Sequence, residues 1–171
     1  MMSKTINVHV TIDTIALAKA YSNPSKDFNN PTGIGHNFSY MIATSNTISG
    51  SGTGDLNFSA QVGDTVRFFG NSASNNFEDA ILLYGIDRFG GVEVFSPFMS
   101  LTFTKNGVSP SNQNVLPAHI GSQQFWFYQS SVIIAGTENY KVVFAFYKRD
   151  ENGNPILFGY FQWDPTITVT G

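Results

Sequence analysis

Three histidines are the side chains of this 171-residue chain best suited to binding a metal or moving a proton near neutral pH. They are His9, His36 and His119, and they lie far apart in the sequence. No pair of them has the His-x-His or His-Glu-x-x-His spacing that presents two ring nitrogens to one metal ion. A zinc or copper site would have to be assembled by the fold, and we interpret the histidines as polar surface or loop residues. We therefore expect no metal and no other cofactor.

The acidic residues offer no obvious pair of carboxylates for acid–base catalysis. Glu78 and Asp79 are adjacent, as are Asp150 and Glu151, and adjacent side chains point apart on a strand or into solvent in a turn. Segment 150–154 is rich in oxygen ligands, but it lacks the glycine placement and downstream glutamate of an EF-hand, so we interpret it as a turn. The sequence contains no nucleophile elbow, Walker loop or dinucleotide fingerprint. We predict that the protein is not an enzyme, although a Ser/His/Asp triad assembled by the fold stays open.

The segment from Asn23 to His36 is the best candidate for a ligand-binding or interface loop. It contains two prolines and two glycines and is longer than an ordinary turn, which is typical of functional loops. Its amide, carboxylate and imidazole groups can hydrogen-bond sugar hydroxyls, and a tryptophan can stack on a sugar face. The candidate residues are Asp27, Asn29, Asn30, His36, Trp163 and Asp164. The alternative is that the aromatic residues fill the core and the asparagines bind the backbone of their own loop.

The composition favours a weakly charged protein that associates with itself. Only 12% of residues are charged, 15% are aromatic, the formal net charge is −3 and there is no cysteine. The absence of cysteine removes disulfides, thiolate metal ligands and a cysteine nucleophile. The nine lysine and arginine residues are scattered, so we expect no nucleic-acid partner. Little charge repulsion keeps copies of such a chain apart, so limited solubility or ordered self-association is expected.

The N-terminal sequence indicates a cytoplasmic protein. Its first ten residues lack the apolar core of a secretory signal and lead directly into strand-like alternation. No apolar run approaches the length of a membrane-spanning helix, so we expect no membrane span.

Alternating apolar and polar residues predict that the chain, residues 1–171, forms one β-sheet domain. The alternation is clearest in residues 5–13 and 139–147. Residues 53–70 are predicted to form a hairpin that reverses at Gly63-Asp64. Residues 14–21 are predicted to form one or two helical turns with Asp13 as the N-cap.

The remaining elements complete an all-β protein. Further strands are predicted at 38–44, 80–86, 92–95, 99–104, 124–134 and 156–163, with a last short strand in the tail 163–171. Residues 22–37 and 105–122 are predicted to be long irregular stretches. The economical solution is a two-sheet antiparallel β-sandwich of roughly 8–10 strands with at most one short helix.

The order and spacing of several segments resemble the bacterial AidA/PixA inclusion-body protein family over nearly the whole chain. The segments are 7–14, 23–34, 40–44, 62–66 and 163–167. The resemblance implies a bacterial, non-enzymatic β-sandwich protein, made under density- or quorum-linked control in some relatives and stored as cytoplasmic crystalline inclusions in others. It supplies no catalytic residues. Inclusion-forming relatives are associated with methionine-rich sequences, whereas this chain has four methionines, which favours the AidA-like branch over methionine storage.

We therefore predict a bacterial protein that forms a homo-oligomer, dimer or higher, through an uncovered sheet edge or the long loops. Its role would lie in assembly or host interaction, with a glycan or host protein as candidate partner. Its expected location is the cytoplasm, in inclusions or followed by export through a non-classical route. The alternative function is a lectin-like carbohydrate-binding module that uses the loop Asn23–His36. A third, a cupredoxin-related or metal-dependent enzyme, is suggested only by the pattern at 62–66.

Overall fold

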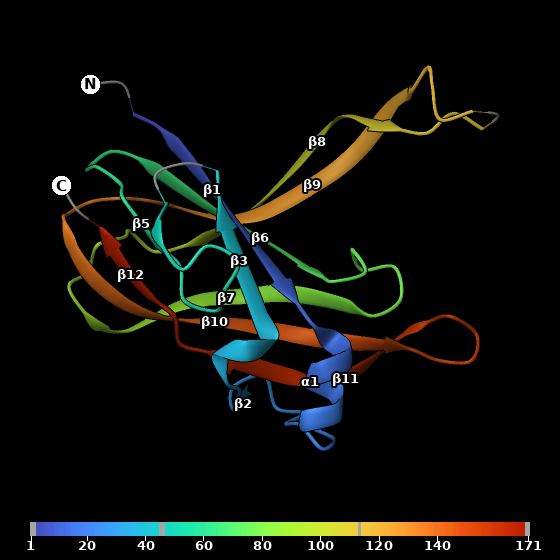
Figure 1. Ribbon diagram of the computed structural model, residues 1–171, viewed down its shortest axis with the longest axis horizontal. Helices are drawn as coiled ribbons and strands as arrows, with labels where there is room; N and C mark the ends of the chain where they lie inside the picture. Colours follow the sequence, from blue (N-terminus) through green and yellow to red (C-terminus); the bar gives the residue numbers. More distant parts are fainter. Residues whose placement is uncertain (1–2, 45–46, 113, 170–171) are drawn as a thin grey trace.

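The structure is a computed structural model that describes residues 3–44, 47–112 and 114–169. Strands dominate these residues, with one short α-helix and one 3₁₀ turn, so the predicted all-β sandwich with a single short helix is confirmed. Figure 1 shows the strands in two layers and a hairpin of β8 (Met99–Ser109) and β9 (His119–Ser131) that projects away from them. Within the described part of the chain, no helix is long and apolar enough to cross a bilayer.

The first sheet has five strands in the order β3-β1-β6-β9-β8. Besides β8 and β9 it contains β1 (Thr5–Ile12), β3 (Ser39–Ala43) and β6 (Thr65–Ser72). The pair β1 and β6 is parallel, whereas the other neighbours in this sheet are antiparallel. The antiparallel arrangement expected for the sandwich therefore holds for most described pairs but not for this central one, nor for β2 (Thr32–Gly33) and β11 (Pro155–Trp163) in the second sheet.

The second sheet is built on β10, which is the longest strand. It comprises β2 (Thr32–Gly33), β7 (Ala80–Gly91), β10 (Gly136–Arg149), β11 (Pro155–Trp163) and β12 (Thr166–Val169). One edge of β10 pairs with β7, while β11 and β12 share the other edge. A separate small sheet pairs β4 (Thr47–Ser49) with β5 (Asn57–Phe58).

The core lies between the two main sheets. The four apolar side chains of β1 predicted to share one face, and the four of β10, are all buried: Ile6, Val8, Val10, Ile12, Tyr140, Val142, Phe144 and Phe146. Phe161 and Trp163 of β11 pack against Phe144, with ring centroids 5.5 Å and 6.0 Å away. Each fully buried side chain of this size stabilises the fold by about 1.5–3 kcal/mol before entropy is counted, so these two alternating patterns determine how the sheets face each other.

The short helix α1 (Thr14–Ala20) follows β1 as the sequence predicts. The side chain of Asp13 caps it, because Asp13 Oδ1 accepts a hydrogen bond from the Ala16 N–H at 2.9 Å. Leu17 is fully buried and fixes the helix against the core.

The predicted hairpin at Gly63-Asp64 is wrong in its pairing, although the turn itself is present. Gly63 has a φ of +94°, and the Asp64 N–H donates to the Gln61 carbonyl at 2.9 Å. The strand before the turn, β5, pairs with β4, whereas β6 after it pairs with β1 and β9. The physical reason is that the turn reverses the chain direction but does not determine which strand pairs with which. Pairing of β6 with β1 sets buried Val66 and Phe68 beside buried Ile6 and Val8, so one apolar face continues across both strands.

Two other predicted segments also differ from the structure. Residues 105–109 and 119–122, the two ends of the stretch predicted to be irregular, instead extend β8 to Ser109 and begin β9 at His119, in a continuous antiparallel register, whereas the described residues between them form no strand or helix, as predicted. Residues 92–95, predicted to be a strand, contribute only a single bridge between Phe95 and Val132. The first difference lengthens the hairpin that projects from the sandwich in Figure 1.

Asp64 is a buried carboxylate that ties the turn to the start of β1. It is 3% exposed, and its two oxygens accept the N–H groups of Lys4 and Gln61 at 2.8 Å and 2.9 Å. Asp64→Ala leaves both donors without an acceptor, and we expect the free energy of unfolding to fall by roughly 2–4 kcal/mol. Asp64→Asn keeps one acceptor oxygen and should lose clearly less. Urea denaturation of the three proteins tests this, and equal losses in both variants would contradict it.

Candidate functional site

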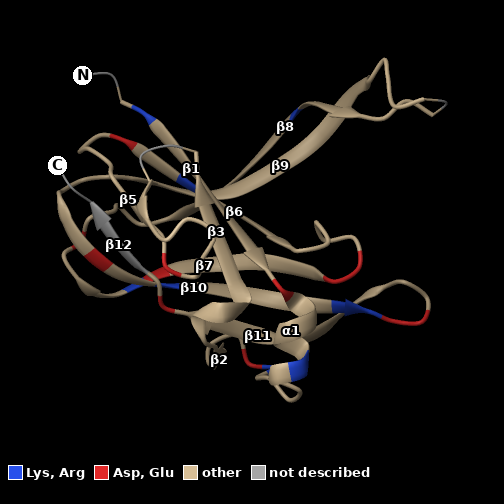
Figure 2. Cartoon of the chain, viewed as in Figure 1, with Lys and Arg blue, Asp and Glu red and all other residues tan. Residues whose placement is uncertain are grey.

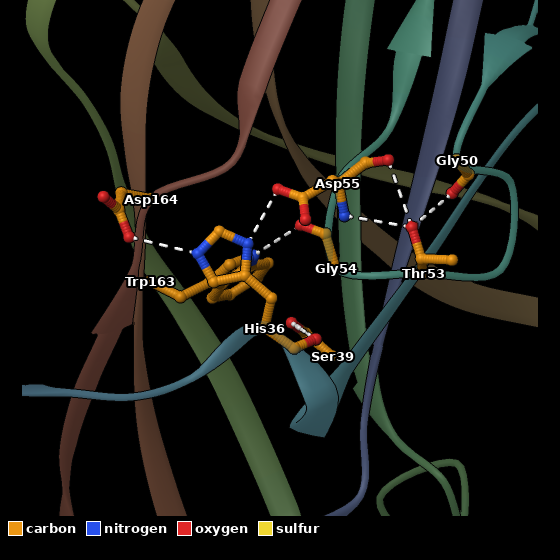
Figure 3. Close-up of polar contacts among 8 residues, drawn as sticks. All are labelled: His36, Ser39, Gly50, Thr53, Gly54, Asp55, Trp163 and Asp164. Carbon is orange, nitrogen blue, oxygen red and sulfur yellow. Dashed lines mark hydrogen bonds and ion pairs between the residues drawn. The ribbon is translucent and has the colours of Figure 1, made fainter.

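His36 lies between two carboxylates and joins three separate loops. Its Nδ1 is 2.7 Å from Asp55 Oδ1, and its Nε2 is 3.3 Å from Asp164 Oδ1. Figure 3 shows the imidazole ring held between the two acidic side chains, each from a different segment. The three side chains are 39%, 55% and 57% exposed, so the cluster is at the surface.

The local backbone brings the three residues together. His36 opens the 3₁₀ turn η1 (His36–Phe38), and Asp164 directly follows β11. Trp163 is buried, and its indole N–H donates to the Gly54 carbonyl at 3.1 Å, which fixes the loop that carries Asp55. A Cβ at Gly54 would lie only 2.2 Å from the His36 carbonyl oxygen, so only glycine permits this close approach of the two loops.

The contacts of His36 with Asp55 and Asp164 link three loops electrostatically, and we call this cluster the tie. Both ring nitrogens already face carboxylates, so neither is left to take a proton from a serine or threonine nucleophile, as a catalytic triad requires. The two hydroxyl groups drawn in Figure 3, those of Ser39 and Thr53, donate to backbone carbonyls instead. Among residues 3–44, 47–112 and 114–169, no group of three or more acidic or histidine side chains is arranged to hold a metal ion.

An open hollow of about 390 Å³ lies beside this tie. Its lining includes Tyr21, Gly35, Lys141, Gln162 and Asp164. The indole of Trp163 also lines it but is only 1% exposed, so its face is covered by protein and a sugar ring has no room to stack on it.

The structure separates the other predicted site residues from this cluster. Asp27, Asn29 and Asn30 are exposed in the turn before β2. Asp27 Oδ1 accepts the Asn29 N–H at 2.9 Å, and the Asp27 carbonyl accepts the Asn30 N–H at 3.1 Å. The turn thus uses Asp27 to satisfy its own backbone, and of the six predicted residues the structure brings together His36, Asp164 and the neighbouring Trp163.

The loop ahead of β2 packs against the second sheet. The Ser25 carbonyl accepts the Tyr160 N–H at 2.9 Å, and a Cβ at Gly159 would lie 2.6 Å from Cβ of Pro24. The Tyr84 hydroxyl donates to the Phe28 carbonyl at 3.0 Å. Burial, reinforced by nearby Tyr160, raises the pKa of Tyr84 to about 12, so the phenol keeps the proton that this bond needs. The loop therefore covers the sheet instead of standing free.

Glu138 is a second acidic residue that sequence reasoning missed. It is 3% exposed on β10, and its Oε2 accepts the N–H groups of Val94 and Phe95 at 2.6 Å and 3.0 Å. Burial raises the pKa of its carboxyl, although these two hydrogen bonds oppose the shift. Its contacts hold segment 92–95 against β10, which gives it a structural role.

The two missed acidic residues left different traces in the sequence. Asp55 lies in a Gly-Thr-Gly-Asp stretch that resembles any polar loop, and its partner is nineteen positions away, so no local signal identifies it. Glu138 occupies a position of β10 whose alternating neighbours Tyr140 and Val142 point into the core. Extending the alternation of residues 139–147 backward by one position would have marked it as a buried charge.

Comparisons with known proteins agree over the whole fold. The family model of PixA, described as an inclusion body protein, matches residues 4–169. The crystal structure of an inclusion body protein (PixA) from Burkholderia cenocepacia J2315 is similar to this chain, with a TM-score of 0.88 and 30% sequence identity. The similarity covers 99% of this chain and 98% of that chain. No curated protein matches the chain.

The tie through His36 should be weak but measurable. Both of its partners are more than half exposed, so we expect a coupling energy between His36 and Asp55 of about 0.2–1 kcal/mol. A double-mutant cycle with His36→Ala and Asp55→Ala, measured by urea denaturation, gives this value directly. The same cycle with Asp27→Ala in place of Asp55→Ala is the control and should give no coupling. Coupling of several kcal/mol to Asp55 would contradict a surface tie.

The raised pKa of Glu138 predicts a pH-dependent stability. The folded protein holds this proton more tightly than the unfolded chain, so unfolding free energy falls as pH rises above the ordinary value of 4.5. Glu138→Gln removes this ionisation and keeps an acceptor for the two N–H groups. Relative to the unchanged protein, the variant should therefore gain stability as the pH rises above 4.5.

Urea titrations at several pH values measure this difference for Glu138→Gln. Glu138→Ala serves as the comparison, because it leaves both N–H groups unsatisfied and should cost about 1–3 kcal/mol for each of them. A stability difference between Glu138→Gln and the unchanged protein that stays constant with pH would refute the expected ionisation.

Proposed function

The chain belongs to the PixA family of inclusion body proteins, and from this membership we propose that it is a non-enzymatic bacterial protein that functions by self-association. The observation that carries the proposal is the projecting hairpin of β8 and β9, which we call the arm (residues 99–131). Large apolar side chains on the arm are exposed to solvent: Met99, Phe103, Val108, Val115, Leu116, Phe125 and Ile120. Val108, Val115 and Leu116 are each 72% exposed. Side chains of this kind concentrated on one projection are typical of an interaction surface.

The outer side of the arm adds a shallow apolar hollow of about 360 Å³. Phe69, Phe103, Phe125 and Phe127 line it, and the guanidinium of Arg67 lies over the Phe127 ring with its carbon 4.8 Å from the centroid. The rings of Phe69 and Phe127 are 5.1 Å apart, so the aromatic surface continues from the arm onto the sandwich.

The arm carries almost no charge. Lys105 is the one lysine, arginine, aspartate or glutamate in residues 99–131. Figure 2 shows β8 and β9 in tan along nearly their whole length, with a single blue segment on β8. A neutral projection is not repelled by its own copies, and this supports a second copy of the chain as the partner.

The proposal includes the setting that family resemblance suggests. The protein would accumulate in the cytoplasm, in inclusions, under density- or quorum-linked control, with a role in assembly or host interaction. The occupied ring nitrogens of His36 support a non-enzymatic role at the one cluster that unites predicted site residues.

Self-association predicts a mass in solution above that of one chain, 18.7 kDa. We expect light scattering to give a discrete dimer or a larger closed oligomer, with a mass that rises with protein concentration. Because the arm is nearly uncharged, added salt should not dissociate the oligomer. A strict monomer at high concentration at every salt concentration would refute the proposed function.

A further inference from the structure

The arm is an isolated two-stranded ribbon over most of its length. The strand β9 pairs with β6 only through residues 128–131, whereas its pairing with β8 continues from Gln129 to His119. Within the described residues, β8 pairs with β9 alone. A two-stranded ribbon is marginally stable in water, so an arm of this length gains from a third strand.

The outer edge of β8 lacks the features that protect sheet edges. Folded proteins protect exposed edges with short strands, charges, prolines or bulges. The edge strands β3 and β12 are short, and the register of β7 with β10 shifts at two points, one of them next to the charged Arg88. In contrast, β8 runs for 11 residues without proline or register shift, and Lys105 is its one charge. All of its residues except Leu101 and Gly107 are exposed.

The hydrogen-bonding direction of each β8 residue follows from β9. The Val132 N–H donates to Asp64 on the β6 side, and the Ser131 carbonyl accepts the Ser96 N–H on the opposite side. Backbone groups of successive residues point to alternate sides of a strand, so odd-numbered residues of β9 face β8. They stand opposite odd-numbered residues of β8. The even-numbered residues of β8 therefore direct their N–H and C=O groups to the open edge: Ser100, Thr102, Thr104, Asn106 and Val108.

We propose that this edge pairs with β8 of a second copy of the chain, antiparallel and across a two-fold axis at Thr104. Full overlap of residues 99–109 places Thr104 opposite Thr104 of the second copy and Thr102 opposite Asn106. A register that pairs odd-numbered with even-numbered residues would place N–H and C=O groups that point to the open edge opposite residues whose groups point to β9. An axis at Lys105 would place two lysines of like charge opposite each other. The axis at Thr104 instead places Lys105 opposite Phe103 of the second copy.

The inference rests on the proposed function and specifies its interface. Pairing would convert two five-stranded sheets into one continuous sheet and would bring the apolar outer faces of both arms side by side. Because a two-fold contact uses the same edge on both copies, it closes a dimer and does not by itself grow further.

A proline at the axis tests the edge pairing. Thr104→Pro removes an N–H that points outward, so the pairing of β8 with β9 is kept, as prolines on edge strands are tolerated in this orientation. Thr104→Val is the matched control, since it keeps the N–H and the β-branched shape. We expect Thr104→Pro to weaken dimerisation at least about tenfold by light scattering, whereas Thr104→Val stays close to the unchanged protein.

Single cysteines test the register, because the chain has no cysteine of its own. Directly opposed residues in this type of pair have Cα atoms about 5.5 Å apart, within the range that a disulfide bridges. Under mild oxidation, Thr104→Cys should form covalent dimers. Thr102→Cys and Asn106→Cys should each remain uncrosslinked alone but form dimers when the two proteins are mixed.

The outcomes separate this inference from the proposed function. If the unchanged protein associates and Thr104→Pro associates equally well, the β8 interface is wrong while self-association stands. Equal crosslinking of all three cysteine variants alone would also overturn the register. If circular dichroism shows that Thr104→Pro is unfolded, the pattern of cysteine crosslinks becomes the test of the interface. A Thr104→Cys protein that associates but forms no crosslink would refute the interface.

Discussion

Burial of alternating apolar side chains between the two sheets is the interaction on which the rest of the structure depends. The inward faces of β1 and β10 provide it, and the aromatic cluster of Phe144, Phe161 and Trp163 completes it. Once Trp163 is fixed in that core, its indole holds Gly54, and Gly54 brings Asp55 to His36. The surface cluster is therefore a consequence of core packing. Its polar side chains are positioned by a buried ring and contribute little to stability themselves.

How much of the fold could be predicted follows from which residues have a buried face. β1, β10 and the helix capped by Asp13 were predictable, because one-sided burial imposes a period of two and a cap requires a specific residue type. The partner of β6 was not predictable, since a turn at Gly63-Asp64 reports a local reversal and the parallel pairing with β1 is set by residues sixty positions apart. The outer part of the arm, residues 105–109 and 119–122, was missed for a different reason. Most of its side chains are exposed, so its sequence lacks the alternation that burial of one face imposes.

The candidate site shows the same limit. Residue types that can bind a ligand were recognisable in the loop 23–36, but whether their polar groups were available depended on contacts distant in sequence. Asp27 is engaged by the backbone of its own turn, and Trp163 is covered by protein. Asp55 and Glu138 are positioned by partners nineteen and more than forty residues away. Sequence thus identified chemistry that was possible, while tertiary packing determined which side chains face solvent.

The arm is the part of the molecule in which local strand structure is formed but its burial is incomplete. In β11, by contrast, the backbone is paired and the strand is covered. It has neighbouring strands on both edges, and the loop ahead of β2 packs against it. Pairing of β8 with β8 of a second copy would give the backbone groups of the arm's open edge hydrogen-bond partners. It would leave no long unprotected edge on the dimer. Further growth into inclusions would then depend on weaker contacts of side chains outside the arm, such as the exposed Ile15 and Phe77. A directional first step followed by non-directional contacts allows a weakly charged protein to remain a discrete species at low concentration and to condense at high concentration.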